Sequence, residues 1–366
     1  MKNILYFTRT MAIGGTEKVV LQLCKSMQSQ FDKIVVCSCG GVNVKLLDEM
    51  HIKHYLIDDI EKKNPKVFFN TIKMLLDIMG RENINVVHTH HRVAAFYVRL
   101  IKSVKPKLVF IHTAHNTFYD RKALTRFALN QSNVVAVGER VRENLLNIYN
   151  QANKKVTVIL NGIEVNKGPF IRVREIEKYK NEGYFLVGNV GRITEQKGME
   201  YFVRSVPEVI KINPRIQFFI IGDGEDRLKI EKLVVELNVS EHVTFLGYRN
   251  DVFSVMKQLD LIVLTSLWEG FPLAPIEAFC VGKTVLATEV DGTAEIVRNG
   301  YNGLLVKPRD SNGIAKSILA LANDSEWREQ LSRQAYDTYL KEFSFEVFKN
   351  RYEIYYQGII SEVING

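Results

Sequence analysis

The chain has few cysteines and no long uninterrupted apolar run. Its four cysteines, Cys24, Cys37, Cys39 and Cys280, are too few in 366 residues for a disulfide framework and lack zinc-ligand spacing, so we expect buried thiols. No window approaches the roughly 18 consecutive apolar residues that span a bilayer. The apolar start breaks at residues 8–10, before a signal-peptide core forms. We therefore expect a cytoplasmic protein.

The composition also excludes disordered and fibrous chains, because 46% of the residues are hydrophobic and 25% are charged. The length predicts two domains or one large one. The net charge of +8 is unevenly distributed. Residues 1–165 hold 24 basic and 13 acidic side chains, a net +11, and the remainder holds 25 and 28, a net −3. A basic first half indicates an anionic partner, which could be nucleic acid, a membrane surface or a phosphorylated substrate.

Short β-branched and aromatic runs alternate with segments of helical period throughout the chain. This alternation predicts parallel sheets covered by helices, an α/β fold. In the first half we expect strands at residues 3–7, 33–37, 86–88, 108–112, 134–137 and 156–160. In the second half we expect strands at residues 184–190, 216–221, 243–246, 261–265, 284–288 and 304–306. Each half therefore predicts a Rossmann-like domain.

A charged segment interrupts the alternation between residues 164 and 183 and indicates an interdomain linker. We place the N-terminal domain at residues 1–170, the linker at 171–183 and the C-terminal domain at 184–344. The last segment has helical spacing from residue 345 to 363 and, on its own pattern, could pack on either domain.

Paired glycines follow the first expected strand. Gly14 and Gly15 directly precede a helix, where backbone amides can approach a phosphate or a sugar closely. An ordinary glycine turn is the alternative. The third glycine of a dinucleotide-binding fingerprint is missing, so that motif is not supported.

Two cations follow the first strand of the second half. Arg192 and Lys197 lie between Gly191 and Gly198, at a junction from strand to helix. Arg192 offers a planar donor fork and Lys197 a mobile point charge, a combination suited to the two phosphates of a nucleotide diphosphate. The alternative is a solvated loop.

Two carboxylates flank a predicted helix start after the strand at 261–265. Glu269 lies on the loop, Glu277 lies one turn inside the helix, and Pro275 is well placed as its first residue. Carboxylates beside the positive end of a helix can stay ionised and accept hydrogen bonds from sugar hydroxyls. The alternative is a helix start with incidental acidic residues.

Histidines gather at two expected strand ends, at residues 88–91 and at 112 and 115. No carboxylate or cysteine partner has metal-ligand spacing, so we expect no metal site. A structural or solvent-facing role is the commoner one for any single histidine. His115, beside Asn116, is the best candidate for direct substrate contact.

Taken together, these residues resemble glycosyltransferase family 4, whose members have the two-domain GT-B fold. The matching motifs occur in the family's order over nearly the whole chain: Gly14-Gly15, the strand ending in His115, residues 158–163, Gly191-Arg192 through Lys197-Gly198, residues 221–224 and 245–248, and Glu269 with Glu277. Glu164 and the pair Gly138-Glu139 depart from the usual residues, and the second departure affects the acceptor side.

The resemblance implies two Rossmann-like domains that face each other across a cleft, with a nucleotide-sugar donor on the second and the acceptor on the first. Arg192 and Lys197 would bind the diphosphate, Glu277 the ribose hydroxyls and Glu269 the transferred sugar. Further roles implied are amide contacts at Gly270, Phe271 and Leu273, phosphate approach by Gly15, sugar contact by His115, and a base pocket at Gly247, Tyr248 and Arg249. The family's C-terminal segment packs on the first domain, so we assign residues 345–366 there.

Arg192 and Lys197 provide fixed positive charge opposite the leaving diphosphate, which stabilises the transition state more than the ground state. No Asp-x-Asp motif ends an expected strand, and we therefore expect a metal-independent enzyme without a cofactor. Family members retain the anomeric configuration. With no obvious carboxylate nucleophile, we favour same-face attack assisted by the departing phosphate oxygen.

The site residues do not identify the acceptor, and UDP is expected because it is the family's commonest carrier. A predicted helix in the basic half has apolar positions at Val93, Phe96, Tyr97, Leu100, Ile101 and Val104. Its cations are Arg92, Arg99, Lys102 and Lys105, and Arg121, Lys122 and Arg126 form a second cluster. Such a surface could contact anionic lipid, so we expect a glycan or lipid-linked acceptor of bacterial surface polysaccharide synthesis. The alternative for this helix is ordinary packing on the sheet.

Two other classes of function are an epimerase and a nucleic-acid binder. A sugar-nucleotide epimerase could share the fold and would convert a nucleotide sugar without an acceptor. Within the transferase class, the acceptor could instead be a small soluble molecule. A nucleic-acid binder would account for the basic half but not for Arg192, Lys197, Glu269 and Glu277 in the acidic half. We find none of the common nucleic-acid-binding motifs and expect no nucleic-acid partner.

Overall fold

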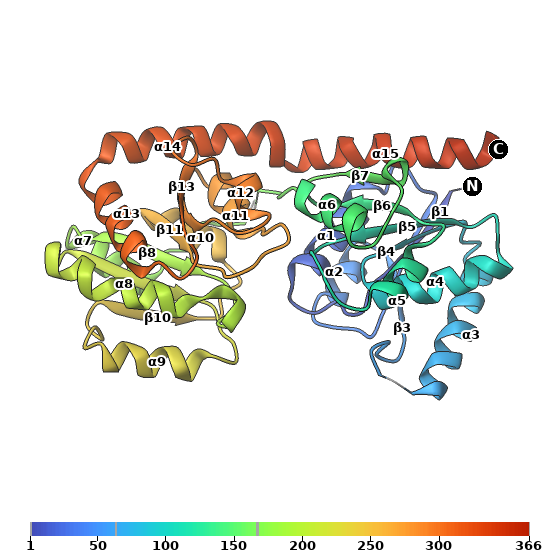
Figure 1. Cartoon of the computed structure of the whole chain (residues 1–366), viewed down its shortest axis with the longest axis horizontal. Helices are drawn as coiled ribbons and strands as arrows, with labels where there is room; N and C mark the ends of the chain where they lie inside the picture. The colour runs from blue at the N-terminus through green and yellow to red at the C-terminus, as the bar shows by residue number, and fades with distance from the viewer. Residues whose placement is uncertain (1, 63, 166–167, 366) are drawn as a thin grey trace. The chain divides into compact units, whose positions relative to one another are not determined.

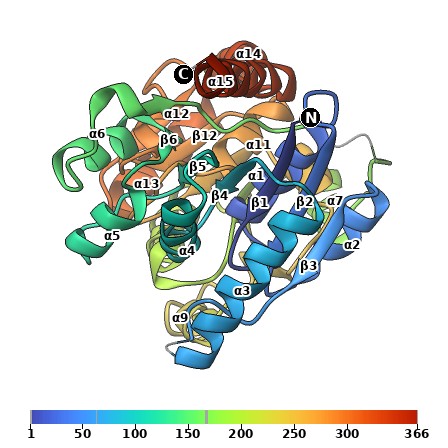
Figure 2. The same cartoon turned by 90° about the vertical axis from the view of Figure 1, so that its right-hand side faces the viewer.

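The computed structural model describes residues 2–62, 64–165 and 168–365, with side chains up to residue 361. Asn166 and Lys167 of the charged segment lie outside the described residues. The chain divides into two compact units. The first comprises Met1–Asn161 together with Phe345–Gly366, and the second comprises Gly162–Ser344. Each unit is an α/β structure built on one parallel sheet (Figures 1 and 2).

The first unit contains a seven-stranded sheet in the order β3-β2-β1-β4-β5-β6-β7. All neighbours in this sheet are parallel. The strands are β1 (Asn3–Phe7), β2 (Lys33–Ser38), β3 (Lys53–Leu56), β4 (Val86–Thr89), β5 (Val109–Ala114), β6 (Asn133–Ala136) and β7 (Val156–Val158). Central strands such as β1 are buried along their whole length, because helices cover both faces of the sheet.

Helices cover the two faces of the first sheet according to the alternation of side chains along β1. Ile4 and Tyr6 pack in one core with residues of α1, α2 and α15, while Phe7 on the opposite face contacts the Tyr97 ring of α4. The helices of this unit are α1 (Gly15–Ser26), α2 (Val44–Glu49), α3 (Pro65–Arg81), α4 (Arg92–Val104), α5 (Lys122–Leu129), α6 (Glu139–Asn147) and α15 (Phe345–Asn365), with the 3-10 turn η1 (Asn153–Lys155).

The second unit contains a six-stranded parallel sheet in the order β10-β9-β8-β11-β12-β13. Its strands are β8 (Phe185–Val190), β9 (Ile216–Ile221), β10 (Val243–Gly247), β11 (Leu261–Leu264), β12 (Val285–Thr288) and β13 (Gly303–Val306). One face packs on α8, α9, α13 and α14 in a single hydrophobic core. The α/β prediction and its two Rossmann-like halves are confirmed.

The helices of the second unit are α7 (Arg174–Asn181), α8 (Met199–Ile212), α9 (Arg227–Glu236), α10 (Val252–Gln258), α11 (Ala274–Cys280), α12 (Thr293–Ile296), α13 (Ser311–Asn323) and α14 (Ser325–Thr338). The 3-10 turn η2 (Glu195–Lys197) precedes α8, and the π-helical turn η3 (Tyr339–Phe343) follows α14. Within the described residues, no helix combines the length and the apolar character needed to cross a membrane.

The structure differs from the sequence interpretation between residues 162 and 183. The compact second unit begins at Gly162, whereas the prediction kept residues up to 170 in the first domain. The expected linker at 171–183 contains the helix α7, whose Ile176 is fully buried. Among its charged residues, Ile176 is buried and the Tyr179 ring contacts the Phe219 ring of β9. The C-terminal helix α15 belongs to the first unit, where Tyr352 and Tyr356 join the core.

Both sheets have a point where the strand order reverses, between β1 and β4 in the first unit and between β8 and β11 in the second. Successive connections leave such a point in opposite directions, which opens a crevice at the carboxyl ends of the two strands. Ligands of open parallel sheets bind there. Gly15, Arg192, Lys197 and Glu269 follow these strand ends, whereas His115 follows β5 and Tyr248 follows β10.

Candidate active site

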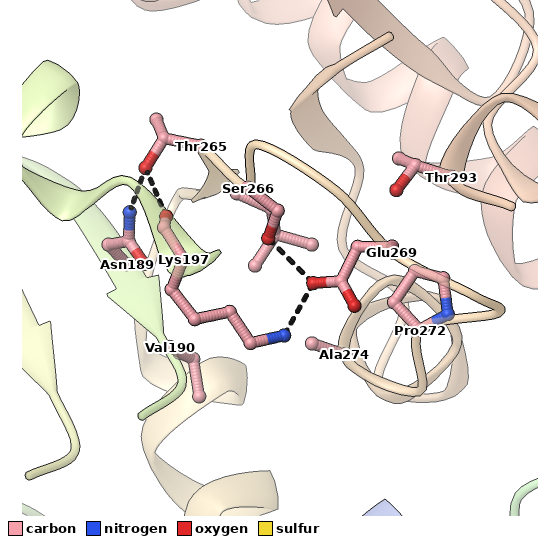
Figure 3. Close-up of a pocket in the computed structure, with 10 residues that line it drawn as sticks. Asn189, Val190, Lys197, Thr265, Ser266, Glu269, Pro272, Ala274 and Thr293 are labelled. Atoms are coloured by element: carbon pink, nitrogen blue, oxygen red, sulfur yellow. Dashed lines mark hydrogen bonds and ion pairs between the residues drawn. The ribbon is translucent and has the colours of Figure 1, made fainter. Parts of the chain in front are cut away.

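The second unit has a narrow pocket at the reversal point of its sheet, between the ends of β8 and β11. Its lining comprises Asn189, Val190, Lys197, Leu264, Thr265, Ser266, Glu269, Pro272, Ala274 and Thr293 (Figure 3). Two loops form most of it, one at residues 191–198 after β8 and one at residues 265–273 after β11. Of the residues predicted for the donor site, the pocket brings together Lys197 and Glu269.

Lys197 and Glu269 form an ion pair in this pocket, with Nζ and Oε1 2.5 Å apart. Ser266 Oγ also donates to Glu269 Oε1, at 2.6 Å (Figure 3). The Glu269 side chain is 8% exposed and the Lys197 side chain 22%, so the pair lies largely out of bulk water. Such a pair is strong because its solvent screening is weak. An anionic ligand phosphate would compete with Glu269 for the Lys197 ammonium.

Hydrogen bonds fix the two loops to each other beneath this pair. Thr265 Oγ1 donates to the carbonyl oxygen of Lys197 at 3.1 Å and accepts from Asn189 Nδ2 at 3.0 Å. The Leu267 amide donates to the Gln196 carbonyl oxygen at 2.8 Å. The backbone of Lys197 is therefore held to the end of β11, and its side chain points at Glu269.

Glycines allow this close approach. Gly198 has φ +55°, in the left-handed region, and a Cβ there would overlap the carbonyl oxygen of Thr265. Gly222, which follows β9, has φ +143°, and a Cβ there would overlap the carbonyl oxygen of Gly191. These contacts give a physical reason for two glycines in the motifs that resemble the family.

Arg192 and Glu277 lie outside the lining of this pocket. Arg192 follows β8 on the same loop as Lys197, and its side chain is exposed. Within the part of the chain that the structure describes, this guanidinium has no ion pair or hydrogen-bond partner. Glu277 lies in the first turn of α11 and is partly buried. Arg192 is therefore accessible to an anionic ligand.

The segment at residues 270–273 leads from Glu269 into α11. Phe271 is buried, and its ring contacts the Phe343 ring at a centroid distance of 6.1 Å. Leu273 caps the N-terminus of α11, which begins at Ala274 rather than at Pro275. Because the Phe271 side chain is buried, only its backbone could contact a ligand. The family resemblance likewise implies a contact through the Phe271 amide.

The predicted base pocket lies at the end of β10. Gly247 has φ +66°, and the adjacent Tyr248 is 57% exposed. Arg249 is held by Asp251 through two hydrogen bonds, of 2.8 and 2.6 Å. The Arg249 guanidinium lowers the pKa of the Asp251 carboxyl. The two hydrogen bonds hold the Arg249 side chain on its own loop. The exposed Tyr248 ring is available for stacking.

In the first unit, His115 lies at the end of β5 and faces a second histidine at the end of β4. His90 Nδ1 and His115 Nε2 are 3.0 Å apart, within hydrogen-bond distance. Burial is the main cause that lowers the pKa of His115 to about 3, and the pKa of His90 also falls well below its usual value. Both imidazoles are neutral at neutral pH. Sequence reasoning did not assign His90 this role.

Gly15 is the first residue of α1, as expected for an amide that approaches a phosphate. Glu17, in the same turn, accepts a 2.5 Å hydrogen bond from Thr10 Oγ1. A Cβ at Gly14 would overlap the Glu17 carboxylate, which thus folds back toward the start of the helix. This carboxylate already interacts with the positive end of α1.

The basic helix predicted in the first half is α4, and the structure changes its interpretation. Tyr97 and Ile101 are buried, but Val104 is 70% exposed. Arg92 pairs with Asp120 at 2.8 Å. Lys102 donates to the carbonyl oxygens of residues 106 and 108, and burial lowers its pKa. Part of the positive charge on α4 therefore serves the first unit itself.

Sequence reasoning missed the polar residues that complete the pocket, namely Asn189, Thr265, Ser266 and Thr293. Thr265 and Ser266 follow an apolar strand directly, which is a signal for a ligand-facing strand end. Among the described residues, no cluster of three or more His, Cys, Asp or Glu side chains has the arrangement of a metal site.

Comparison with known proteins agrees with this geometry. The family model for glycosyl transferases group 1 matches residues 172–338, and the model for glycosyltransferase family 4 matches residues 13–167. An uncharacterised glycosyltransferase of Methanocaldococcus jannaschii is 30% identical over 289 residues, which cover 76% of each chain. The chain belongs to the family 4 type of glycosyltransferases.

Two further similarities cover most of this glycosyltransferase. An Escherichia coli UDP-Gal:alpha-D-GlcNAc-diphosphoundecaprenol alpha-1,3-galactosyltransferase is 24% identical over 333 residues, 85% of this chain and 86% of the relative. The crystal structure of Anabaena HepE in complex with UDP superposes with a TM-score of 0.83 at 19% identity, and covers 98% of this chain and 100% of that chain. The fold is therefore GT-B.

Proposed function

We propose that this glycosyltransferase moves a hexose or N-acetylhexosamine from a nucleotide sugar to a hydroxyl group of a glycan or lipid-linked acceptor. The observation that supports the proposal most directly is the largely buried Lys197–Glu269 pair at the reversal point of the second sheet, with the exposed Arg192 on the same loop as Lys197. Two cations and a carboxylate at one strand edge match a diphosphate followed by a polyhydroxylated sugar.

The same residues define the chemistry that we propose. Breaking the bond between the sugar and the phosphate puts negative charge on the leaving diphosphate and positive charge on the sugar ring. Arg192 and Lys197 would stabilise the diphosphate, and Glu269 would orient and stabilise the sugar. The cations would thus act without a metal ion.

We propose UDP as the nucleotide and retention as the stereochemical outcome. UDP occupies the HepE structure, and the Escherichia coli relative uses UDP-galactose by its name. Retention follows from same-face attack, in which the departing phosphate oxygen assists deprotonation of the acceptor hydroxyl. An NMR spectrum of the product decides this point, and an inverted anomer would exclude the same-face mechanism.

A panel of nucleotide sugars, assayed for free nucleotide, tests the activity without knowledge of the acceptor. We expect slow hydrolysis of one UDP-sugar that persists in a chelator. Lys197→Ala should lower the rate about 100-fold to 1,000-fold, by analogy with loss of one transition-state donor. Glu277→Ala should raise KM for the same donor, because the ribose contact is lost.

Lys211→Ala on the exposed end of α8 is the matched control and should leave hydrolysis unchanged. Hydrolysis that Lys197→Ala leaves intact would place the chemistry elsewhere. Conversion of a nucleotide sugar to its epimer without acceptor would assign the epimerase function instead.

We also propose that the protein works in the cytoplasm, peripherally on an anionic membrane, in bacterial surface polysaccharide synthesis. The support is the basic first unit, together with the lipid-linked acceptor in the name of the Escherichia coli relative. A small soluble acceptor is the alternative, and it requires no membrane contact.

A further inference from the structure

The first unit contains a cavity of about 930 Å³, and none of the residues that line the narrow pocket of the second unit lines it. This volume is at the upper end of the usual range for small-molecule pockets. Helices α3, α4, α5 and α6 supply much of its wall. The rest comes from the ends of β4 and β5, from Thr16 of α1 and from loop residues that include Glu61 and Phe118. Its apolar side chains include Phe68, Phe96, Tyr97, Leu124, Leu129 and Leu145.

The strand ends give this cavity a polar wall. His90 and His115 both line it. The His90 side chain is 3% exposed, and its Nε2 has no hydrogen-bond partner among the described residues. A buried ring nitrogen without a partner is unfavourable unless a ligand completes it. The polar wall is therefore suited to a hydroxyl or phosphate oxygen.

The apolar wall continues to the protein surface. Leu124, which lines the cavity, is 47% exposed, and Phe69 of α3 is 68% exposed. Phe127 on the same helix as Leu124 is 39% exposed, and its ring contacts the Phe96 ring at 5.6 Å between centroids. Large apolar side chains grouped at a cavity rim mark a binding surface more often than a chance exposure.

The rings in the wall are inclined to one another and form no parallel slot. The Tyr97 ring makes angles of 33° with the Phe68 ring and 82° with the Phe96 ring. These rings therefore cannot sandwich a flat aromatic ligand between parallel faces, whereas a flexible hydrocarbon chain can follow an irregular apolar wall. The cations Arg121, Lys122 and Arg126 lie on or directly before the same helix, α5, and are exposed, which complements an anionic ligand or lipid surface.

We propose that this cavity binds the hydrocarbon chain of an amphiphilic acceptor, with the chain's polar end at His90 and His115. The inference rests on the proposed function, because it names the acceptor class of the same enzyme. The chain would leave the cavity past Leu124 and Phe127, where a long lipid could remain in its bilayer.

Binding of farnesyl diphosphate and inorganic diphosphate, measured by calorimetry without a donor, tests the proposal. We expect farnesyl diphosphate to bind at least about tenfold more tightly. Val93→Trp fills the cavity beside His91, and Leu124→Asp places a charge at its rim. Each variant should weaken farnesyl diphosphate binding at least about tenfold without changing the binding of inorganic diphosphate.

Leu228→Asp is the matched control, since Leu228 is 71% exposed on α9 of the other unit. Because Leu124 is exposed, Leu124→Asp keeps the test valid if Val93→Trp does not fold. Equal affinity for the two diphosphates, or unchanged binding in Leu124→Asp, would overturn the proposal. Preference for a flat aromatic dye over the farnesyl chain would also overturn it.

The experiments can exclude the transferase function and the hydrocarbon-binding role of the cavity independently. Chain-dependent binding in a protein that hydrolyses no nucleotide sugar would leave the cavity assignment standing and remove the transferase assignment. Donor hydrolysis that is sensitive to Lys197→Ala, combined with no preference for the farnesyl chain, would leave the transferase and exclude a hydrocarbon acceptor site.

Discussion

In the proposed reaction, Lys197 and Glu269 would each have two roles. Without a ligand, the pair joins the loops that follow β8 and β11. With a donor, the Lys197 ammonium would turn to a phosphate and the Glu269 carboxylate to sugar hydroxyls. The buried pair would therefore keep both charges satisfied until a donor replaced each partner, since an unpaired buried charge is strongly unfavourable.

This exchange of partners predicts opposite effects of Glu269→Gln on binding and on catalysis. UDP should bind about tenfold more tightly, because the Lys197 ammonium no longer has a competing carboxylate. The hydrolysis rate of the UDP-sugar should fall about 100-fold, because the sugar loses its carboxylate partner. Calorimetry with UDP and a nucleotide-release assay measure the two quantities.

Glu208→Gln, at an exposed position of α8, removes the same charge from the same unit and should change neither quantity. A parallel loss of UDP affinity and hydrolysis in Glu269→Gln would mean that Glu269 acts only by positioning Lys197.

At the residue scale, the sequence shows which side chains could take part in chemistry, but it does not show which of them contact each other. Lys197 and Glu269 can be identified because a cation and a carboxylate follow apolar strands. The contact between them could not be read from the sequence, because 72 positions separate the two residues. His90 was passed over, since one histidine among several carries no signal until its neighbour across the sheet is known.

At the scale of elements, Gly198 joins the turn η2 to α8 and sets the position of Lys197. Its φ of +55° is unfavourable for other residues, and a Cβ there would overlap the carbonyl oxygen of Thr265. Gly198→Ala should lower the free energy of unfolding by about 3 kcal/mol, of which about 1 comes from the backbone and about 2 from the overlap. Denaturant unfolding measures this loss.

A substitution at Gly282 distinguishes the backbone contribution from the contribution of the overlap with Thr265. Its φ is +72°, but a Cβ there meets no atom within 4 Å. Gly282→Ala should therefore lower the free energy of unfolding by only about 1 kcal/mol and leave donor hydrolysis intact. Equal losses in the two variants would show that the approach to Thr265 contributes nothing.

The histidines of β4 and β5 predict a pH-dependent stability. Burial lowers the pKa of His112 to about 3 and lowers that of His88 well below its usual value. In the unfolded chain these groups titrate near pH 6.5, so below that pH the unfolded state binds more protons and is favoured. For His112, the free energy of unfolding should fall by about 2 kcal/mol between pH 8 and pH 5, and His88 should lower it in the same direction.

The paired carboxylate of Glu82 should not change the free energy of unfolding between pH 8 and pH 5. Ion pairing with Lys33 and Lys53 lowers the pKa of Glu82 to about 2, so its contribution is retained down to about pH 4.5, where the unfolded state titrates. Denaturant unfolding at pH 8 and pH 5 provides the test. His112→Gln should show about 2 kcal/mol less difference between the two conditions, and an identical free energy of unfolding for the unchanged protein at both would contradict neutral buried histidines.

The element scale also shows where sequence patterns fail. The strands of both central sheets could be predicted, because burial on both faces produces continuous apolar runs. The edge strand β3 was missed, since its four residues are only partly buried and include Lys53 and His54. The helix α7 was missed because one buried residue, Ile176, anchors an otherwise charged segment. Elements with few buried residues have weak apolar periodicity and are therefore hard to recognise in the sequence.

At the scale of the whole molecule, the charge asymmetry follows the boundaries of the two units. Residues 1–161 and 345–366 contain 26 basic and 15 acidic side chains, a net +11, and residues 162–344 contain 23 and 26, a net −3. In the proposed function, the donor site would lie in the unit of net negative charge, where Arg192 and Lys197 would bind the diphosphate. The basic charge of the first unit would then be available to an anionic acceptor or surface.

This asymmetry predicts sedimentation with anionic liposomes at low salt and release at high salt. Each basic side chain near an anionic surface contributes about 1 kcal/mol, and salt shortens the range of that attraction. Lys122→Glu combined with Arg126→Glu on α5 should abolish sedimentation. Lys211→Glu combined with Lys232→Glu changes the net charge equally in the second unit and should not. Equal loss in both double variants would indicate attraction by overall charge alone, and equal binding to neutral liposomes would indicate apolar contact without charge recognition.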